Sequence, residues 1–312
     1  MRKIVMRIKA IMNRRSKNGG NNNLKTLLKK GLEPLLTGIE ETAYPGHATE
    51  IAAQAARENI DTVVAVGGDG TVNEVLNGIV GTNVALGIVP TGTANDLASL
   101  YKIPADIDQA CAVVVKRRLQ SVDVISVNDR HYVTSGGLGF PCQVVRMANK
   151  IKHHALVGRL LARILGSKLY ILAVLCAILK KARTAEALSV ECNGSSMKLD
   201  PLWVIVSNQT FLGRNFLIAP GAVNSDGMFD VCLVQNHTTR FQVLSIVKKV
   251  IGGKHTHSPC VKIWRANELL LESEKALSFF ADGELLGQAQ KFNVRIMPRA
   301  LNLIVPQAIS GA

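Results

Sequence analysis

The sequence predicts an α/β domain with a parallel sheet, followed by a β-rich antiparallel domain. Up to about residue 120, short apolar strands alternate with helical stretches, which is typical of a parallel sheet with helices on both faces. Beyond Asp123, alternating apolar and polar residues are separated by turn dipeptides, which is typical of antiparallel strands. We therefore place the domains at 1–124 and 125–297, with a tail at about 298–312 that could return to the first domain.

The length and composition support two domains and an anionic partner. A chain of 312 residues exceeds the usual size of a single core, and its 47% apolar residues can fill two cores. The net charge of +14 indicates nucleic acid, an anionic membrane or a phosphorylated ligand as the partner. The aromatic content of 4% and the lack of an RNA-binding or zinc-finger signature argue against nucleic acid.

The cysteines and the first residues are those expected of a cytoplasmic chain. The six cysteines include no Cys-x-x-Cys pair, as in proteins of a reduced compartment. Residues 1–10 interleave charges with apolar residues, whereas a signal peptide has a continuous apolar block. The longest uncharged apolar stretch, 169–179, has 11 residues and is too short to span a bilayer.

Seven segments of the first domain are expected to form its strands and helices. In chain order they cover 4–12, 24–36, 48–58, 62–66, 72–79, 85–89 and 94–100. Ligands of such sheets bind at the carboxyl ends of the strands. We expect the loops 13–20 and 90–95 to meet there with the glycine-rich turn that follows residue 66.

The second domain is expected to consist of short antiparallel strands. They cover 188–192, 203–207, 228–234, 261–265, 269–271, 277–280 and 292–297. Residues 148–182 differ, because they carry a helical pattern with lysines and arginines around an apolar middle. This basic amphipathic insertion could lie in a membrane interface, or it could pack on the sheet with its lysines solvated. The sequence does not decide between these two interpretations.

Residues 63–75 predict a phosphate-binding turn. An apolar β-branched run ends in glycines around Asp69, and a helix is expected to begin near Thr71. Glycines can take positive φ and bring backbone N–H groups close to an anion, which the helix N-terminus also faces. Because a carboxylate would repel a phosphate, we expect Asp69 to reach a nucleotide hydroxyl or a Mg²⁺ water shell. The alternative is an ordinary turn that closes on Asp-Gly.

The next βα unit carries a second glycine loop. Thr93 or Asn95 could cap the helix that follows it. Asp96, together with Asp69 and Asp123, places three acids near one edge of the predicted sheet. At such an edge a hydrated Mg²⁺ can be held beside nucleotide phosphates.

The two loops resemble those of the diacylglycerol kinase catalytic domain family, particularly its soluble bacterial lipid kinases. The first loop reads Gly67-Gly68-Asp69-Gly70-Thr71 followed by Asn73-Glu74, and the second reads Pro90-Thr-Gly-Thr-Ala-Asn-Asp96. NAD kinases and 6-phosphofructokinases share the first motif, whereas the second is not expected in NAD kinases. The resemblance extends through nearly the whole chain. It implies the fold that NAD kinases and diacylglycerol kinases share, with ATP and Mg²⁺ as cofactors.

The resemblance also implies ATP contacts and metal ligands. The ATP contacts are Asn13, Ser16, Thr42, Gly67, Gly68, Asp69, Gly70, Thr71, Val72, Asn73, Glu74, Thr91, Gly92, Thr93 and Asn95. The metal ligands are Asp96 and Asp123 near the nucleotide, and, at a structural Mg²⁺ site, the Asp226 side chain with the carbonyls of Val223 and Met228. A hairpin turn is the alternative for Asp226-Gly227. Loop 13–20 lacks the family's proline and gains positive charge, which leaves its phosphate contacts open.

Asp282 resembles the family's proposed general base. Phosphoryl transfer to an alcohol needs a group within hydrogen-bonding reach of the attacking hydroxyl, and Asp282 can accept that proton. Glu284 lies two residues further on, so in an extended chain it projects to the same side. We expect Glu284 to orient the reacting groups or to contact the metal.

The leading hypothesis is an ATP-dependent lipid kinase that transfers the γ-phosphate to a lipid hydroxyl, with diacylglycerol as the favoured acceptor and phosphatidic acid as the product. The first domain would hold ATP and Mg²⁺, and the second would bring the acceptor hydroxyl and Asp282 across the cleft between the domains. Positive charge would keep the enzyme at the inner face of an anionic membrane, and the resemblance raises the expectation of a homodimer. The alternatives are a kinase acting on NAD and a nucleotide-binding, membrane-associated regulator without turnover.

Overall fold

The chain folds into two compact units. Unit 1 comprises residues 1–124 and 299–312, and unit 2 comprises residues 125–298. The chain passes between the units through the long strands β5 (Leu119–Val127) and β14 (Glu284–Ile304). The computed structural model describes residues 6–14, 21–153, 173–174, 176–178, 187–213, 216–235 and 239–307.

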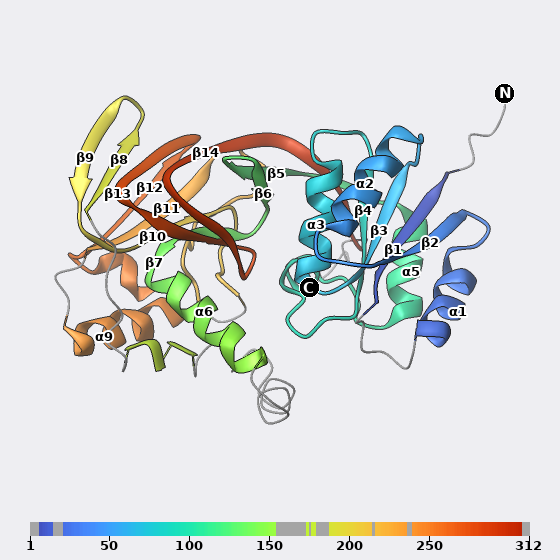
Figure 1. The fold of residues 1–312 in the computed structure, drawn as a ribbon, viewed down its shortest axis with the longest axis horizontal. Helices are drawn as coiled ribbons and strands as arrows, with labels where there is room; N and C mark the ends of the chain where they lie inside the picture. The colour runs from blue at the N-terminus through green and yellow to red at the C-terminus, as the bar shows by residue number, and fades with distance from the viewer. Residues whose placement is uncertain are drawn as a thin grey trace. The chain divides into compact units, whose positions relative to one another are not determined.

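Unit 1 is the predicted α/β unit with a parallel sheet (Figure 1). Its own elements are β1 (Ile8–Asn13), α1 (Asn21–Leu32), β2 (Leu36–Thr42), α2 (His47–Arg57), β3 (Thr62–Gly67), α3 (Asp69–Ile79), β4 (Ala85–Pro90), α4 (Asp96–Leu100) and α5 (Ile107–Lys116). The strand order is β2-β1-β3-β4, and the end of β14 adds a further parallel strand beside β4.

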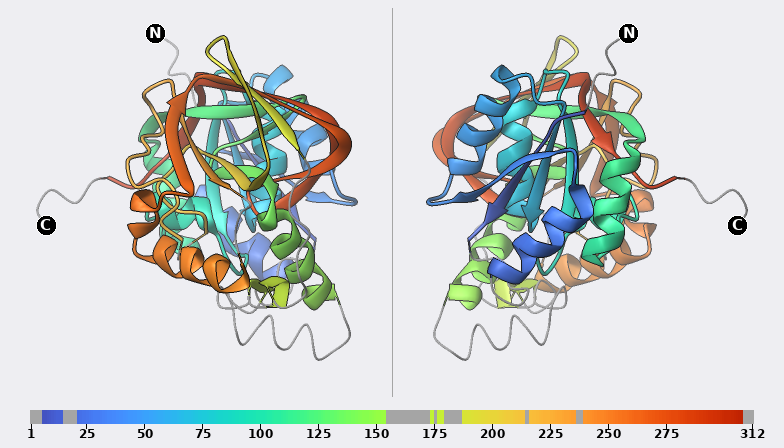
Figure 2. Two further views of the ribbon diagram at one scale, coloured as in Figure 1. Left: turned by 90° about the vertical axis from the view of Figure 1, so that its left-hand side faces the viewer. Right: turned by 90° about the vertical axis from the view of Figure 1, so that its right-hand side faces the viewer.

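Two helix pairs, α1 with α5 and α2 with α3, pack on this sheet (Figure 2). The strands β3 and β4 are buried along their whole length, as expected where helices cover both faces. Leu24, Leu28 and Leu32 of α1 are fully buried against apolar strand residues and against Val114 of α5.

Strand β2 and helix α5 were not predicted, and the segment predicted at 24–36 extends beyond the end of α1. Strand β2 was missed because it lies at the sheet edge, where its polar residues are only half buried and form no apolar run. Pro34 cannot continue a helix, so α1 ends at Leu32 and not at residue 36. The start of α5 does carry a readable signal, because the Asp106 side chain accepts the N–H of Gln109 at 3.0 Å.

Unit 2 is the predicted β-rich antiparallel unit. Its elements are β6 (Arg130–Tyr132), β7 (Ser135–Gly139), α6 (Phe140–His153), β8 (Leu188–Cys192), β9 (Ser195–Leu199), β10 (Pro201–Ser207), β11 (Phe229–Gln235), α9 (Arg240–Ile251), the 3₁₀ helix η1 (Lys254–His257), β12 (Val261–Ala266) and β13 (Glu268–Ala281). The strand order is β12-β11-β10-β7-β13-β14, and the hairpin of β8 and β9 pairs with β13. The predicted strands 269–271 and 277–280 are parts of the one strand β13.

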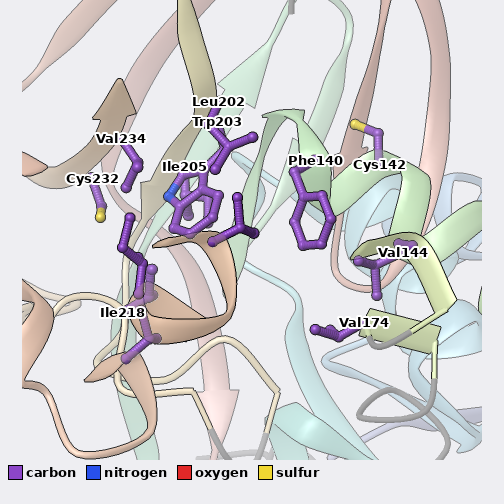
Figure 3. Close-up of a cluster of buried hydrophobic side chains, with 14 of the residues drawn as sticks. Phe140, Cys142, Val144, Val174, Leu202, Trp203, Ile205, Ile218, Cys232 and Val234 are labelled. Carbon is purple, nitrogen blue, oxygen red and sulfur yellow. The ribbon is translucent and has the colours of Figure 1, made fainter. Parts of the chain in front are cut away.

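A buried cluster on the helical side of the unit 2 sheet bears on the basic amphipathic insertion (Figure 3). Phe140 and Trp203 lie in this cluster, with ring centroids 6.2 Å apart. Val174, Ala177 and Ile178, which belong to the predicted insertion, are buried in it. These residues therefore pack on the sheet, whereas most of 154–186 lies outside the described residues. None of the helices that the structure describes is long and apolar enough to cross a membrane.

Candidate functional site

Four parallel strands of unit 1 end at the same edge of the sheet, as Figure 1 shows. The last residues of β1 and β2, Asn13 and Thr42, are paired, and so are Gly67 and Pro90 at the ends of β3 and β4. The Asn13 side chain donates to the Thr71 hydroxyl at 3.1 Å and so ties β1 to α3. Asn13 and Thr42 therefore lie at the edge where both glycine loops begin, whereas Ser16 lies outside the described residues.

The two glycine loops pack directly against each other. A Cβ added to Gly92 would meet the Cα of Gly68 at 2.4 Å, and one added to Gly68 would meet the Cα of Gly92 at 3.1 Å. The Thr91 N–H donates to the Gly67 carbonyl at 2.9 Å. The expectation of positive φ in the first loop is wrong, because Gly68 has φ −98° and none of Gly67, Gly68 and Gly70 is left-handed. The glycines are needed for close backbone approach.

Asp69 joins the two loops through its carboxylate. One oxygen accepts the Asn95 N–H at 2.9 Å, and the other accepts the Asp96 N–H at 2.6 Å. Both donors lie at the start of α4, so the carboxylate caps that helix from the preceding βα unit. This bonding explains how a carboxylate is accommodated in the predicted phosphate-binding turn, because its oxygens accept backbone N–H groups of the second loop.

Asn95 shapes the second loop in a way that the sequence analysis did not foresee. It occupies the N-cap position of α4 with left-handed φ of 51°, yet its side chain makes no hydrogen bond to the helix. The side chain instead accepts from the Gly92 N–H at 3.1 Å and donates to the Gly92 carbonyl at 3.0 Å. The predicted side-chain cap by Asn95 is therefore wrong. Thr93 is exposed beside it and Thr91 is buried.

The residues after the first turn also hold unit 1 together. Glu74 accepts the Ala48 N–H at 3.2 Å, so its carboxylate meets the N-terminus of α2. The Thr49 hydroxyl donates to the Glu74 carbonyl at 2.9 Å. Asn73 accepts from the Asn77 side chain through its carbonyl and its side-chain oxygen, and Val72 is 6% exposed. Packing between α2 and α3 is thus one role of this segment, and ATP contact by these residues stays a prediction.

Two of the three acids predicted for Mg²⁺, Asp69 and Asp123, have carboxylates that accept backbone N–H groups of unit 1. Asp123 is fully buried in β5 and accepts the Arg299 N–H at 2.8 Å. Asp96 begins α4 next to the Asp69 carboxylate. Within the described part of the chain, no three His, Cys, Asp or Glu side chains are grouped to hold a metal ion. Mg²⁺ binding by these acids therefore stays a prediction.

The edge of the unit 1 sheet fits a phosphorylated ligand. Helix α3 begins at Asp69 directly after Gly68, so the N–H groups of its first turn point toward this edge. Gly70 is exposed, and nothing lies within 4 Å of the position its Cβ would occupy. Backbone donors and the exposed Thr93 hydroxyl can therefore approach an anion here.

Asp282 lies in the turn between β13 and β14 of unit 2. Asp282 and Gly283 have φ of 47° and 81°, and Ala281 pairs with Glu284. Both values are left-handed, as a two-residue type I′ hairpin requires and as Asp-Gly favours. The expectation of an extended chain from Asp282 to Glu284 is therefore wrong. Glu284 is exposed and accepts from the Asn149 side chain at 3.5 Å.

Thr134 fixes the Asp282 carboxylate. The same carboxylate oxygen accepts the Thr134 hydroxyl at 2.5 Å and the Thr134 N–H at 3.0 Å, while the Asp282 N–H donates to the Ser135 carbonyl at 3.1 Å. Beneath them, the hydroxyls of Ser135 and Ser207 lie 2.6 Å apart. Burial and, to a lesser extent, Asp282 raise the pKa of the fully buried Tyr132 well above its ordinary value. Thr134 lies 148 residues from Asp282 in the chain, so no local pattern could have revealed it.

The predicted structural metal loop is closed by hydrogen bonds and an ion pair. Asp226 accepts the Met228 N–H at 3.1 Å with one oxygen, and its other oxygen pairs with Arg265. Val223 is half exposed. Burial raises the pKa of the neighbouring Asp230, an effect that Arg265 opposes and Asp226 reinforces. The sequence analysis did not consider Arg265 as a partner of Asp226, and Mg²⁺ binding here stays a prediction.

Both units match known protein families. Residues 7–127 match the diacylglycerol kinase catalytic domain, and residues 143–305 match the YegS C-terminal NAD kinase beta sandwich-like domain. A diacylglycerol kinase of Bacillus subtilis (strain 168) is 25% identical over 296 residues, which cover 91% of this chain and 93% of the relative. A diacylglycerol kinase of Staphylococcus aureus (strain JH9) is 27% identical over 297 residues, with coverage of 91% and 90%.

Solved structures show the same fold. A crystal structure of a candidate diacylglycerol kinase from Bacillus anthracis str. Sterne superposes with a TM-score of 0.77 at 23% identity, covering 97% of this chain and 98% of the other. Yeast NADH kinase in complex with NADH has a TM-score of 0.51 at 9% identity, with coverage of 98% and 85%. The predicted fold class is confirmed. The chain belongs to the kinase family in which a diacylglycerol kinase catalytic domain is followed by a YegS C-terminal NAD kinase beta sandwich-like domain.

Proposed function

We propose that this protein is an ATP-dependent lipid kinase that transfers the γ-phosphate to a lipid hydroxyl, with diacylglycerol as the favoured acceptor. Membership of a kinase family and the names of the relatives from Bacillus subtilis and Staphylococcus aureus support this proposal. The observation that carries it is Asp282, an acid held in one orientation by two hydrogen bonds from Thr134 in the unit that follows the kinase domain.

We assign the nucleotide to the carboxyl edge of the unit 1 sheet. The phosphates would lie at the start of α3, where backbone N–H groups and the helix dipole favour negative charge. Asn13, Thr42 and Thr93 would supply polar side chains around them, since they lie on the strand ends and the loop at this edge. Asp69 would act by holding the second loop against the first, because both of its oxygens accept backbone N–H groups.

Mg²⁺ would enter with the nucleotide. When bound, it would neutralise the phosphate charge that develops during transfer. Asp96 and Asp123 are the acids of unit 1 that we propose for its surroundings, acting through water. Asp226 with the Val223 and Met228 carbonyls remains the proposed structural site, where a cation would compete with Arg265 for the Asp226 carboxylate.

Asp282 would accept the proton of the acceptor hydroxyl. The oxygen of the lipid alcohol attacks the γ-phosphorus while the bond from that phosphorus to the β,γ-bridging oxygen breaks, so the lipid gains the phosphate and ADP leaves. The O–H bond of the alcohol breaks in the same reaction, and its proton passes to the carboxylate. The Thr134 hydroxyl and N–H fix the orientation of that carboxylate, so it need not reorganise when the proton arrives. Glu284 is proposed only to assist, since it is exposed and makes one long hydrogen bond.

A nucleotide-cofactor kinase is the second candidate, because the fold is shared with yeast NADH kinase. The test offers radiolabelled ATP with mixed micelles of diacylglycerol, monoacylglycerol, phosphatidylglycerol or a sphingoid base, and separately with soluble NAD. We expect a labelled lipid, identified by mass spectrometry, and unlabelled NAD. Labelled NADP would favour the second candidate. Tight ATP binding without transfer to any acceptor would point to a regulator without turnover.

A further inference from the structure

Helix α9 has a well-defined start on the surface of unit 2. It lies on the same side of the sheet as α6 (Figure 1). The Thr239 hydroxyl accepts the Gln242 N–H at 3.3 Å, and the Gln242 side chain accepts the Thr239 N–H at 2.6 Å. This reciprocal capping box fixes the first turn of the helix. The orientation of the residues that follow is therefore set by the fold.

One face of α9 anchors the helix to unit 2. Val243, Ile246 and Val250 recur at helical spacing and are buried in the apolar cluster that also contains Trp203. Lys249, on the flank, donates to the Ser258 hydroxyl at 3.2 Å and so ties the helix to the segment after η1. These contacts account for one side of the helix.

The opposite side of α9 exposes large apolar side chains. Phe241 is 85% exposed, Leu244 is 41% exposed and Ile251 is 49% exposed. Spacings of three and seven residues place them along one side of the helix, with the exposed Lys248 among them. We call Phe241, Leu244, Lys248 and Ile251 the α9 stripe. A ring this exposed contributes little to the core of unit 2. Together with Leu244 and Ile251 it forms an exposed apolar surface that is available to a partner.

The charged residues of α9 and of the chain on either side of it have one sign. Lys248, Lys249 and Lys254 lie on α9 or directly after it, and residues 231–267 contain no Asp or Glu. An apolar stripe with an aromatic residue and lysines beside it is the combination that enters the headgroup region of an anionic bilayer. Lysines near such a surface are attracted to its negative charge.

We propose that the α9 stripe docks on an anionic lipid bilayer, with Phe241 and Leu244 entering the headgroup region and the lysines contacting lipid phosphates. The inference rests on the proposed function, since it gives that enzyme a way to reach a lipid acceptor. It assigns membrane contact to α9. A second copy of this chain is a poorer occupant, because each stripe has lysines in or beside it and chains of net charge +14 repel each other.

The test measures co-sedimentation with vesicles in the absence of ATP. The full chain is offered phosphatidylcholine vesicles with or without phosphatidylglycerol. The test variant is Phe241→Ser with Lys248→Glu. The matched control is Val115→Ser with Lys116→Glu on α5 of unit 1, where Val115 is 40% exposed and Lys116 is also exposed. Thermal unfolding of both variants verifies that they fold.

We expect the parent and the control to bind vesicles that contain phosphatidylglycerol. The test variant should bind them at least about tenfold more weakly, because it loses an inserted ring and reverses a charge. Binding should weaken in high salt and on vesicles of phosphatidylcholine alone. Equal binding by the test variant and the parent would overturn the inference, as would a parent that does not bind. A dimer of the parent without lipid that becomes a monomer in the test variant would also overturn it.

The lipid kinase assay in detergent micelles separates this inference from the proposed function. A parent that binds vesicles through α9 but phosphorylates no lipid leaves the inference standing and refutes the proposed function. A test variant that phosphorylates micellar lipid and still binds vesicles like the parent refutes the inference and supports the proposed function.

Discussion

The close packing of the two glycine loops predicts a large effect of one added methyl group. In Gly92→Ala, the new Cβ would lie 2.4 Å from the Gly68 Cα and 2.7 Å from the Asn95 side-chain oxygen. Carbon atoms pack at about 3.5–4.0 Å, so the loops must separate by about 1 Å. The obstructing atom in the first loop is backbone, so a rotamer change cannot relieve the contact. Overpacking of this kind costs about 1–3 kcal/mol of unfolding free energy.

The same separation should weaken nucleotide binding. Both loops begin at the strand ends where we place the phosphates, and a misplacement of about 1 Å can cost on the order of a hundredfold in activity. We expect the affinity of Gly92→Ala for ATP, measured by calorimetry, to fall at least about tenfold. Gly38→Ala in β2 is the matched control, since nothing lies within 4 Å of the added Cβ and φ is not positive.

Thermal unfolding gives the stability of the two variants, and titration with ATP gives their affinity. The control should be neutral or more stable by up to about 1 kcal/mol, because alanine reduces the entropy of the unfolded chain. Gly92→Ala with the stability and the ATP affinity of the parent would refute the claim that the loops are in contact.

Three further predictions concern single side chains. Thr134→Val should lower the rate of phosphate transfer at least about tenfold, while its ATP affinity stays unchanged. Thr134→Ser, which keeps the hydroxyl, should retain most of the parent rate. A normal rate in Thr134→Val would show that the hydroxyl hydrogen bond to Asp282 is not needed. Asp69→Ala should lose about 1.5–3 kcal/mol of stability, since two backbone N–H groups lose a charged acceptor; chemical denaturation measures this, and a loss below about 0.5 kcal/mol would contradict it. Burial lowers the pKa of His255 below its ordinary 6.5, against the opposing hydrogen bond to the Ile218 carbonyl. The unfolded chain then binds the extra proton, so stability should fall as pH drops below 6.5; His255→Gln should lose less stability over that range, and equal losses in both proteins would contradict the assignment.

Local patterns predicted the elements of unit 1 that combine an apolar run with a turn signal. Strand β3 and helix α3 were predicted because a fully buried strand runs into Gly68 and an amphipathic helix follows. Strand β2 gave no such pattern, since an edge strand needs no apolar run. In unit 2 the alternation predicted the strands, while the length of β13 depends on pairing with β14, which follows it in the chain, and with β7 and β8, which lie far away in the chain.

In the candidate site, too, local sequence patterns were predicted and contacts between distant residues were not. The sequence predicted that both glycine loops matter, because each follows an apolar strand and precedes a helix in consecutive βα units. It did not predict that Asp69 bonds to residues 26 and 27 positions further on, or that Asn95 folds back onto Gly92. The Asp69 contacts depend on two strands lying side by side, whereas the Asn95 contact lies within one loop and depends on the left-handed backbone of that residue. The turn at Asp282 could have been predicted, since Asp-Gly between two apolar runs favours a type I′ hairpin.

The central claim is that Asp282 serves phosphate transfer in an ATP-dependent lipid kinase. The most direct test compares the parent with Asp282→Asn on the same preparations, measuring ATP affinity by calorimetry and transfer of labelled phosphate to diacylglycerol in micelles. The amide cannot accept the proton but can still accept the Thr134 hydrogen bonds, so folding and ATP affinity should match those of the parent while transfer falls at least about a hundredfold. Transfer by Asp282→Asn at the rate of the parent would contradict the account.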